Sequence, residues 1–366
     1  MALVVQKYGG SSLDSPEKIT SLAQRIIARY DSGDRLVIVV SAVGKTTDGL
    51  EDKAHELSAD PDPREVDMLI SVGERESISL MAIAINNIRP GLAISFTGSQ
   101  IGLITDNRHR NARILEIKGD RLVEALDKGR IPIIAGFQGV STDKQITTLG
   151  RGGSDTTAVA VAAALRADHC EIYSDVKGVY SADPKLCPDA VLIEHLDHNT
   201  MLTISSLGAK VLRDAAVEYA HRLGVNITTG LSLTGETGSL ISVDSCLSKN
   251  KFISLVTAEN LPYKTNDSCD ILQGDLENIR FFQQTPSGGI VIYNSLSSSK
   301  HRFCCCSTAL VGAGIRSENK KLYRMKELLL PLNILAIELS DMKFEIYTDY
   351  AVSKVVFNEL HSLFFS

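Results

Sequence analysis

Short apolar runs alternate with longer segments of helical periodicity along the first two thirds of the chain. The run at residues 36–40 is continuously apolar, which is typical of a strand buried on both faces of a parallel sheet. Strands that alternate with helices through about residue 245 predict one α/β domain with a mostly parallel central sheet. The predicted strands lie at residues 4–7, 35–42, 92–96, 131–137, 170–175 and 226–230.

Three of the segments between or after these strands predict helices that bear on function. Residues 65–87 have a helical pattern but contain Gly73. A glycine costs roughly 1 kcal/mol inside a helix and is tolerated where a backbone must approach another group closely. Residues 207–223 predict a helix that carries Lys210. A third helix is predicted to begin at Ser154 and Asp155, because residues 157–167 are almost entirely Ala, Val, Leu and Thr.

The hydrophobic pattern changes at about residue 245. Residues 245–303 are polar and have weak periodicity. Residues 308–365 then predict a strand, a helix, two strands and a helix, which together form a small α+β module. The chain therefore divides near residues 245 and 306.

Composition limits the classes of partner. The 366 residues suffice for two or three domains, and a formal net charge of −6 without a basic run argues against nucleic acid. The longest apolar stretch, at residues 328–337, is interrupted by Pro331 and Asn333 and is too short to cross a membrane. The first residues predict a strand rather than a signal peptide. We expect a cytoplasmic protein that binds neither nucleic acid nor membrane.

Cysteine and histidine spacing predicts no metal site. The seven cysteines form no paired C-x-x-C motifs, so free thiols in a reducing compartment are the better interpretation. His195 and His198 have a metal-like spacing, but structural roles are more common for such a pair.

The stretch TTLGRGGSDTTA, residues 147–158, carries the strongest chemical signal. Its glycines allow a sharp turn and close approach to a ligand, and the N–H groups at the start of the following helix favour anions. Arg151 has the planar fork that binds a carboxylate or phosphate, and Asp155 offers the opposite charge. The pair predicts a site for a zwitterion such as an amino acid. The alternative is a surface Arg/Asp pair on a glycine-rich connection.

Other candidates fall at the carboxyl ends of the predicted strands, where such sheets bind ligands. Lys7 precedes Gly9 and Gly10, so bare N–H groups and an ammonium could grip a phosphate there. An exposed lysine at a strand end is the alternative. Glu74 is either a ligand contact or a solvated helix charge. The remaining strand ends carry Ser41, Phe137 and Asp175, which can share one cleft with Lys7.

Seven blocks resemble the signature blocks of the aspartokinases, in the same order and at similar spacing. They are KYGGSS (7–12), SAVGKTTD (41–48), SVGER (71–75), TGSQ (97–100), residues 147–157, residues 175–184 and LGAKVL (207–212). The resemblance covers roughly the first 245 residues and implies the amino-acid kinase fold. Two departures are Arg213-Asp214, where the family often has His-Pro, and Lys185, where Arg is common.

The resemblance also implies roles for individual residues, with Lys7 and Asp155 as the catalytic residues. Arg151 would bind the α-carboxylate of aspartate, while Glu74 and Asp155 would bind or orient its α-ammonium group. The ATP phosphates would be held by Lys7, Gly9, Gly10 and Ser11. The aspartate site would be lined by Thr47, Glu74, Phe137, Arg151, Gly152, Ser154 and Asp155. The nucleotide would also contact Asp175, Tyr180, Lys185 and Lys210.

The implied activity is the phosphorylation of L-aspartate by ATP to 4-phospho-L-aspartate, the first step of lysine, threonine and methionine biosynthesis. Attack of a carboxylate on the γ-phosphoryl group brings two anions together, so cations, N–H donors and Mg²⁺ are needed. No general base is required, because a carboxylate is already a nucleophile at neutral pH. We expect a homo-oligomer. Alternatives are a kinase for glutamate, N-acetylglutamate or uridylate, and a catalytically weak or silent partner subunit.

The C-terminal part resembles the paired ACT regulatory domains of aspartokinases, but incompletely. Residues 311–317 and the following elements resemble a second ACT unit, although residues 318–320 replace an expected His-Pro-Gly turn. The preceding stretch lacks the Gly-Ile-x-Asp-x-Pro-Gly effector loop. We expect a catalytic domain at 1–245, an eroded first ACT-like segment at 246–306 and an ACT-like domain at 307–366, with little feedback inhibition.

Overall fold

The computed structural model describes residues 1–243, 254–266, 279–285, 288–293, 304–312, 319–329, 331–332 and 334–365. Two compact units can be distinguished. Unit 1 comprises residues 1–179, 192–202 and 210–247, and unit 2 comprises residues 180–191, 203–209 and 248–366. The domain boundaries expected at residues 245 and 306 stay a prediction.

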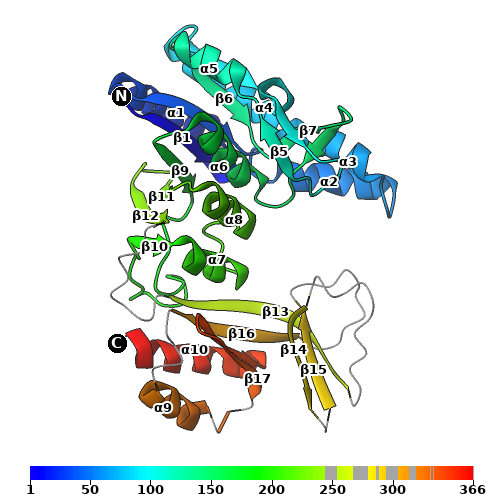
Figure 1. The fold of residues 1–366 in the computed structure, drawn as a ribbon, viewed down its shortest axis with the longest axis vertical. Helices are drawn as coiled ribbons and strands as arrows, with labels where there is room; N and C mark the ends of the chain where they lie inside the picture. The colour runs from blue at the N-terminus through cyan, green and yellow to red at the C-terminus, as the bar shows by residue number, and fades with distance from the viewer. Residues whose placement is uncertain are drawn as a thin grey trace. The chain divides into compact units, whose positions relative to one another are not determined.

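Unit 1 is built on one large sheet (Figure 1). Its strands are β1 (Leu3–Tyr8), β2 (Arg35–Val40), β3 (Ala93–Phe96), β6 (Ile131–Ala135), β9 (His169–Ser174), β10 (His195–Asp197), β11 (Ile227–Leu231) and β12 (Thr237–Ser242). They follow the order β10-β12-β11-β9-β1-β2-β6-β3, and every neighbouring pair is parallel except β11 with β12. The predicted α/β class with a mostly parallel sheet is therefore confirmed. The direction of strand addition reverses between β1 and β9, which is where such sheets bind ligands.

Helices cover this sheet and complete its core. The sequence pattern explains the start of the first helix, because the Oγ of Ser15 accepts a hydrogen bond from the N–H of Lys18 and Pro16 occupies the first turn. The helices of unit 1 are α1 (Pro16–Asp31), α2 (Thr46–Leu57), α3 (Pro63–Ile70), α4 (Val72–Ile88), α5 (Asp120–Asp127), α6 (Gly153–Leu165) and α8 (Asp214–Leu223). Apolar side chains of α1 and α4 form one core cluster with β1, β2 and β6, whereas α6 packs against β1, β2 and β9.

Unit 1 also contains a second sheet of four strands, and its last strand in the sequence immediately precedes the glycine-rich loop. It consists of β4 (Leu103–Thr105), β5 (Ile114–Ile117), β7 (Gln138–Ser141) and β8 (Ile146–Thr148), in the order β5-β4-β7-β8. Strand β8 ends directly before the glycines that precede α6. The second sheet therefore fixes one end of that loop, and α6 fixes the other.

The helix predicted for residues 65–87 is divided into α3 and α4 at Ser71. The expected close approach at Gly73 is confirmed, because a Cβ atom on Gly73 would lie 2.8 Å from the Cβ of Ala42. Helix α4 can therefore pack directly on the loop that follows β2.

The helix predicted for residues 207–223 is wrong in its first part. Helix α7 (His198–Ser206) ends before this segment, and α8 begins only at Asp214. Gly208 has a φ of +112°, a conformation that a helix interior does not contain. Lys210 therefore lies in a connection rather than on a helix.

Unit 2 contains a six-stranded sheet in the order β14-β15-β13-β16-β18-β17. The strands are β13 (Ser254–Asn266), β14 (Ile279–Thr285), β15 (Gly288–Tyr293), β16 (Cys304–Val311), β17 (Ile334–Leu339) and β18 (Lys343–Thr348). With α9 (Asn319–Leu329) and α10 (Tyr350–Phe365), the last three strands form the predicted βαββα order. Strands β13 to β15 lie where the weak periodicity predicted no element, because their regularity comes from antiparallel pairing with neighbouring strands. This β-rich region is consistent with an ACT-like fold.

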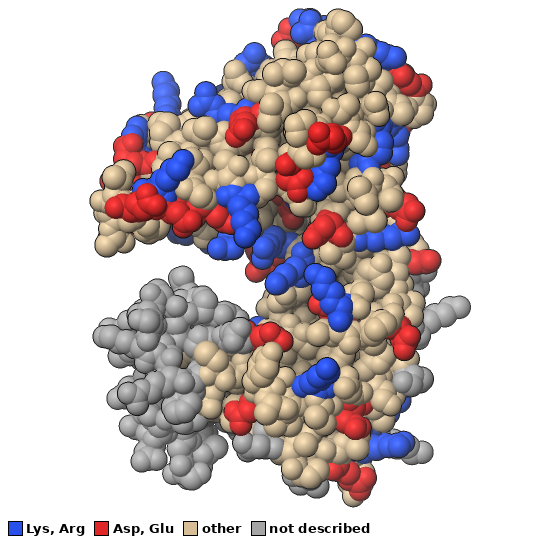
Figure 2. All heavy atoms as spheres, turned by 180° about the vertical axis from the view of Figure 1, so that it is seen from behind, with Lys and Arg blue, Asp and Glu red and all other residues tan. Residues whose placement is uncertain are grey.

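The surface carries charges of both signs. Figure 2 shows Lys and Arg side chains interspersed with Asp and Glu side chains on the face that it presents. Within the described ranges, every helix is too short or too polar to cross a membrane.

Candidate active site

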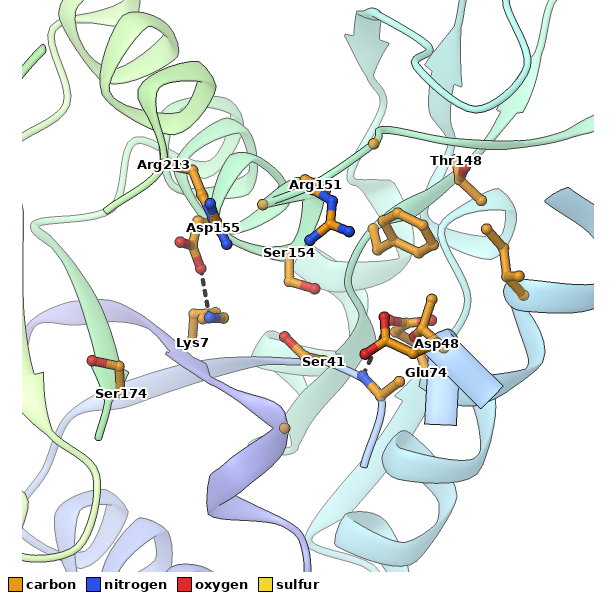
Figure 3. A pocket seen from close by; sticks show the side chains of 18 of the residues that line it. Lys7, Ser41, Asp48, Glu74, Thr148, Arg151, Ser154, Asp155, Ser174 and Arg213 are labelled. Atoms are coloured by element: carbon orange, nitrogen blue, oxygen red, sulfur yellow. Dashed lines mark hydrogen bonds and ion pairs between the residues drawn. The ribbon is translucent and has the colours of Figure 1, made fainter. Parts of the chain in front are cut away.

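A pocket of about 460 Å³ opens at the carboxyl ends of β1, β2, β6 and β9 in unit 1 (Figure 3). The structure brings together here most of the residues expected at the site, which are Lys7, Gly10, Thr47, Glu74, Phe137, Arg151, Gly152, Ser154, Asp155 and Lys210. They come from segments far apart in the sequence. The strand ends therefore bring Lys7, Ser41 and Phe137 to one pocket, as the strand-end argument expects, whereas Asp175 is not among its lining residues.

The other expected residues do not line this pocket. Gly9 and Ser11 flank the lining residue Gly10, and Asp175 is an exposed neighbour of the lining residue Ser174. Tyr180 and Lys185 belong to unit 2. The roles implied for these five residues stay predictions.

Lys7 and Asp155 form an ion pair inside the pocket. Lys7 Nζ lies 2.5 Å from Asp155 Oδ1, and each side chain is only 10% exposed. Lys7 is at the end of β1, while Asp155 is in the first turn of α6, where the helix dipole favours negative charge. The sequence predicted both residues but not that they bind each other.

The glycine loop, defined here as residues 149–153, depends on glycine at two points. Gly152 has a φ of +79°, and a Cβ atom there would lie 2.3 Å from the Cγ of Arg213. Gly150 has a φ of +75°. These positive values are the ones that glycine adopts without strain, so the loop can turn sharply into α6.

Phe137 adopts a left-handed conformation at the other side of the loop, with a φ of +68°. Its N–H donates to Thr157 Oγ1 at 3.1 Å, and its carbonyl accepts from the N–H of Leu149 at 2.8 Å. Such conformations are costly for non-glycine residues and cluster at functional sites. These two hydrogen bonds hold Phe137 against α6 and against the first residue of the glycine loop.

Glu74 is a buried carboxylate with incomplete pairing. Its side chain comes from α4, and the residue is 3% exposed. Oε1 accepts the N–H of Ala42 at 3.1 Å, whereas Oε2 has no hydrogen-bond partner among the described residues (Figure 3). Burial raises the pKa of Glu74 to about 8, and the hydrogen bond from Ala42 only partly offsets it. A cationic ligand group beside Oε2 would stabilise the ionised form.

Several lining residues were not among those expected from the sequence. Arg213 had been noticed only as a departure from the family pattern, yet its side chain covers Gly152. Arg110 forms an ion pair with Glu51 of α2. Residues 106–111 have no apolar periodicity, so no sequence signal points to Arg110. The lining residues outside the expected set include Asp48, Glu51, Arg110, Thr148, Ser174 and Arg213.

The donor set around the pocket does not form a metal cage. Among the described residues, no group of three or more His, Cys, Asp or Glu side chains could hold a metal ion. Magnesium is commonly bound through substrate phosphates, waters and one or two carboxylates, so it does not need such a cage.

Comparison with known proteins defines the class to which this fold and pocket belong. The sequence model of the amino acid kinase family matches residues 2–228, which is more than half of the chain. The chain belongs to the amino acid kinase family.

Within this family, the chain is similar to aspartokinases. It is 52% identical over 243 residues to the aspartokinase of Corynebacterium efficiens, and the match covers 66% of this chain and 58% of that relative. It is 45% identical over 260 residues to aspartokinase 2 of Bacillus subtilis, covering 71% and 64% of the two chains. The chain thus spans less than two thirds of the length of these curated relatives.

Solved structures show the same fold. E. coli aspartokinase III in complex with aspartate and ADP has a TM-score of 0.81 at 22% identity, with both chains fully covered. The aspartate kinase from Synechocystis has a TM-score of 0.60 at 32% identity, covering 99% of this chain and 69% of that one.

Proposed function

We propose that this protein transfers the γ-phosphoryl group of ATP to the side-chain carboxylate of L-aspartate, giving 4-phospho-L-aspartate and ADP. About 50% identity to curated aspartokinases supports this activity. The observation that carries it is the pocket itself, in which Arg151 and the buried, half-paired Glu74 line one cavity with the Lys7–Asp155 pair. A cation for a carboxylate and an anion for an ammonium suit a free amino acid.

In this mechanism the chain's residues bind and orient two anions. Arg151 binds the α-carboxylate of aspartate, and Glu74 accepts its ammonium group through Oε2. Lys7 and the N–H groups of the strand-end glycines neutralise the phosphates, with Ser11 beside them. A side-chain carboxylate oxygen then forms the new P–O bond as the bond from the γ-phosphorus to the bridging oxygen breaks, and ADP leaves with that electron pair. Thr47, Phe137, Gly152 and Ser154 shape the aspartate side, and Asp175 and Lys210 contact the nucleotide.

Asp155 has a specific part in this proposal. Its pairing with Lys7 places the ammonium at the carboxyl end of β1, where a phosphate can bind it. Exchange of one anionic partner for another lets Lys7 bind the phosphate without leaving a buried charge unpaired. Asp155 is then free to orient the ammonium side of aspartate.

ATP fits a pocket that is lined by Lys7, Lys210 and Arg213, and Mg²⁺ would enter with it. Because the described residues offer no metal cage, the nucleotide phosphates would hold most of the ion's coordination sphere. The ion supplies neutralisation of phosphate charge when it is bound.

The test is an ADP-release assay of the purified protein with aspartate, glutamate, N-acetylglutamate and UMP as acceptors. We expect turnover with aspartate at least about tenfold above that with each alternative, which is about 1.4 kcal/mol of discrimination. N-acetylglutamate lacks the ammonium that Glu74 is proposed to bind. Equal turnover with it would contradict the assignment of Glu74, and no turnover with any acceptor would indicate a silent subunit.

We also infer a cytoplasmic homo-oligomer that supplies the pathway to lysine, threonine and methionine, and an ACT-like role for the C-terminal region. Sedimentation analysis at several concentrations tests the assembly. A monomer at micromolar concentration would contradict it.

A further inference from the structure

A buried carboxylate outside the pocket binds two segments that line it. Asp67, on α3, is fully buried and does not itself line the pocket. Its Oδ1 accepts the Thr148 hydroxyl at 2.6 Å, and its Oδ2 accepts the Thr148 N–H at 3.2 Å. The N–H of Arg110 lies 3.1 and 3.0 Å from the two oxygens, and His109 Nδ1 lies 2.9 Å from Oδ2. A buried carboxylate requires such full hydrogen bonding.

The contacts of Asp67 converge on the glycine loop. Thr148 is the last residue of β8 and precedes that loop directly. A Cβ atom on Gly150 would lie 2.9 Å from Asn111 Oδ1 and 3.2 Å from the Arg110 carbonyl. The segment that contains Arg110 therefore packs on the glycine loop. Asp67 binds this segment through Arg110 and binds the residue before the loop, Thr148.

Arg110 is held in an unfavourable backbone conformation. Its φ is +69°, in the left-handed region that non-glycine residues rarely occupy. Strain of this kind persists only where surrounding contacts impose it. The N–H of Arg110 points to both oxygens of Asp67, and its guanidinium pairs with Glu51 on the pocket wall.

We propose that Asp67 is a positioning residue that holds Arg110 and the start of the glycine loop in the geometry that binds the amino-acid substrate. The proposal rests on the proposed function, because it assigns that loop to the amino-acid side of the pocket. Asp67 acts through Thr148 and Arg110 and does not touch the substrate.

The test variant is Asp67→Asn, which removes one acceptor oxygen and introduces an N–H₂ group among N–H and O–H donors. We expect the KM for aspartate to rise at least about tenfold, while the KM for ATP changes less than about twofold. The matched control is Glu171→Gln. Glu171 is a buried carboxylate of unit 1 that accepts Gln6 Nε2 at 2.7 Å and the Tyr173 hydroxyl at 3.0 Å, and it does not line the pocket.

The two variants should both lower the midpoint of thermal unfolding, but only Asp67→Asn should raise the KM for aspartate. Thr148→Val, which removes the hydroxyl donor, should raise it less. The KM for aspartate in the double variant should be no higher than in Asp67→Asn alone, because both substitutions remove the same hydrogen bond between Thr148 and Asp67. Equal KM values in Asp67→Asn and the wild type, or equal rises for aspartate and ATP, would overturn the proposal. If Asp67→Asn does not fold, the same comparison of KM values for aspartate and ATP is made between Thr148→Val and Glu171→Gln.

Hydrogen exchange separates this proposal from the proposed function. Amides of residues 106–113 and 147–153 should exchange faster in Asp67→Asn than in Glu171→Gln. A wild-type protein that does not phosphorylate aspartate would refute the function, and the exchange rates would still decide whether Asp67 holds the loop. Unchanged exchange in both segments would refute the positioning role.

Discussion

The pocket of unit 1 and the interior of unit 2 each contain a buried glutamate, and the two are paired very differently. Glu74 accepts one backbone N–H and leaves Oε2 without a partner among the described residues. Glu345, on β18, is 0% exposed, with Arg280 Nη2 2.7 Å from Oε1 and Lys343 Nζ 3.0 Å from Oε2.

The same physical force has opposite outcomes at these two carboxylates. Burial raises the pKa of Glu74 to about 8. Burial also acts to raise the pKa of Glu345, but the charges of Arg280 and Lys343 outweigh it, so that pKa lies below its ordinary value. The buried ion pairs of Glu345 stabilise the fold. The buried carboxylate of Glu74, which lacks a charged partner, is consistent with a binding site for a cationic ligand group.

The largest expected effect is a loss of folding stability when the ion pair between Arg280 and Glu345 is broken. Arg280→Met leaves Glu345 buried without the guanidinium at Oε1, and loss of a buried charged partner costs about 3–5 kcal/mol. Denaturant unfolding should show this loss, while the control Lys177→Met, which breaks an exposed pair with Glu236, should cost less than about 1 kcal/mol. Similar losses in the two variants would mean that the buried cluster in unit 2 is not a stabilising feature.

Lys7→Ala should have the next largest effect, on turnover. We expect kcat to fall at least about a hundredfold, because the variant lacks the ammonium that neutralises phosphate charge during transfer. Affinity for aspartate should remain largely intact. Lys128→Ala, at an exposed pair on α5, is the control and should have wild-type kinetics. Normal turnover in Lys7→Ala would reduce Lys7 to the structural partner of Asp155.

Arg151→Ala should weaken aspartate binding. A charge-assisted bidentate contact contributes about 1.5–3 kcal/mol, so affinity should fall by about one to two orders of magnitude. ATP affinity should change much less. Arg89→Ala, which removes a surface pair with Asp31, serves as the control in titration calorimetry. Wild-type aspartate affinity in Arg151→Ala would place the amino acid elsewhere.

The raised pKa of Glu74 predicts a pH dependence of aspartate binding. The ammonium group pairs with the ionised carboxylate, so affinity should rise up to about tenfold per pH unit and level off above pH 8. Titrations at pH 6, 7 and 8 measure this slope. In Glu74→Gln the slope should disappear. An unchanged slope in that variant would assign it to another group.

The same pKa has the opposite effect on the stability of the free protein. Between pH 4.5 and about 8 the folded state holds a proton on Glu74 that the unfolded state has lost. Folding stability from this group therefore falls as the pH rises through that window, by at most about 1.4 kcal/mol per unit. Glu74→Gln should remove this slope in denaturant titrations.

The smallest effect is expected from lysine and threonine. An effector shifts an equilibrium only if it binds one state better, and the effector motifs expected of ACT units are missing from this sequence. We expect little inhibition by either amino acid, or by both, at millimolar concentration. Clear inhibition by lysine or threonine below about 1 mM, which corresponds to a binding free energy of about −4 kcal/mol, would mean that an effector site persists.

The sequence by itself determined the elements whose cause is local. Apolar runs were enough to predict β1, β2, β3, β6, β9 and β11, and the run of Ala, Val, Leu and Thr predicted the start of α6, because each depends on periodicity or on a few neighbouring residues. The strands β10 and β12 and the four strands of the second sheet were not predicted. The glycines before α6 indicated a ligand loop for the same reason. The motif blocks also predicted Glu74, Arg151 and Lys7, which line one pocket in the structure.

Only the tertiary structure decided how these elements meet. The pairing of β13 with β16 and the pairing of Lys7 with Asp155 depend on partners that are distant in the sequence. Asp67 and Arg110 carry no local signal, since their importance arises when α3 buries a carboxylate beneath Thr148. The pKa of Glu74 likewise follows from burial, and burial is a property of the folded chain rather than of its local sequence.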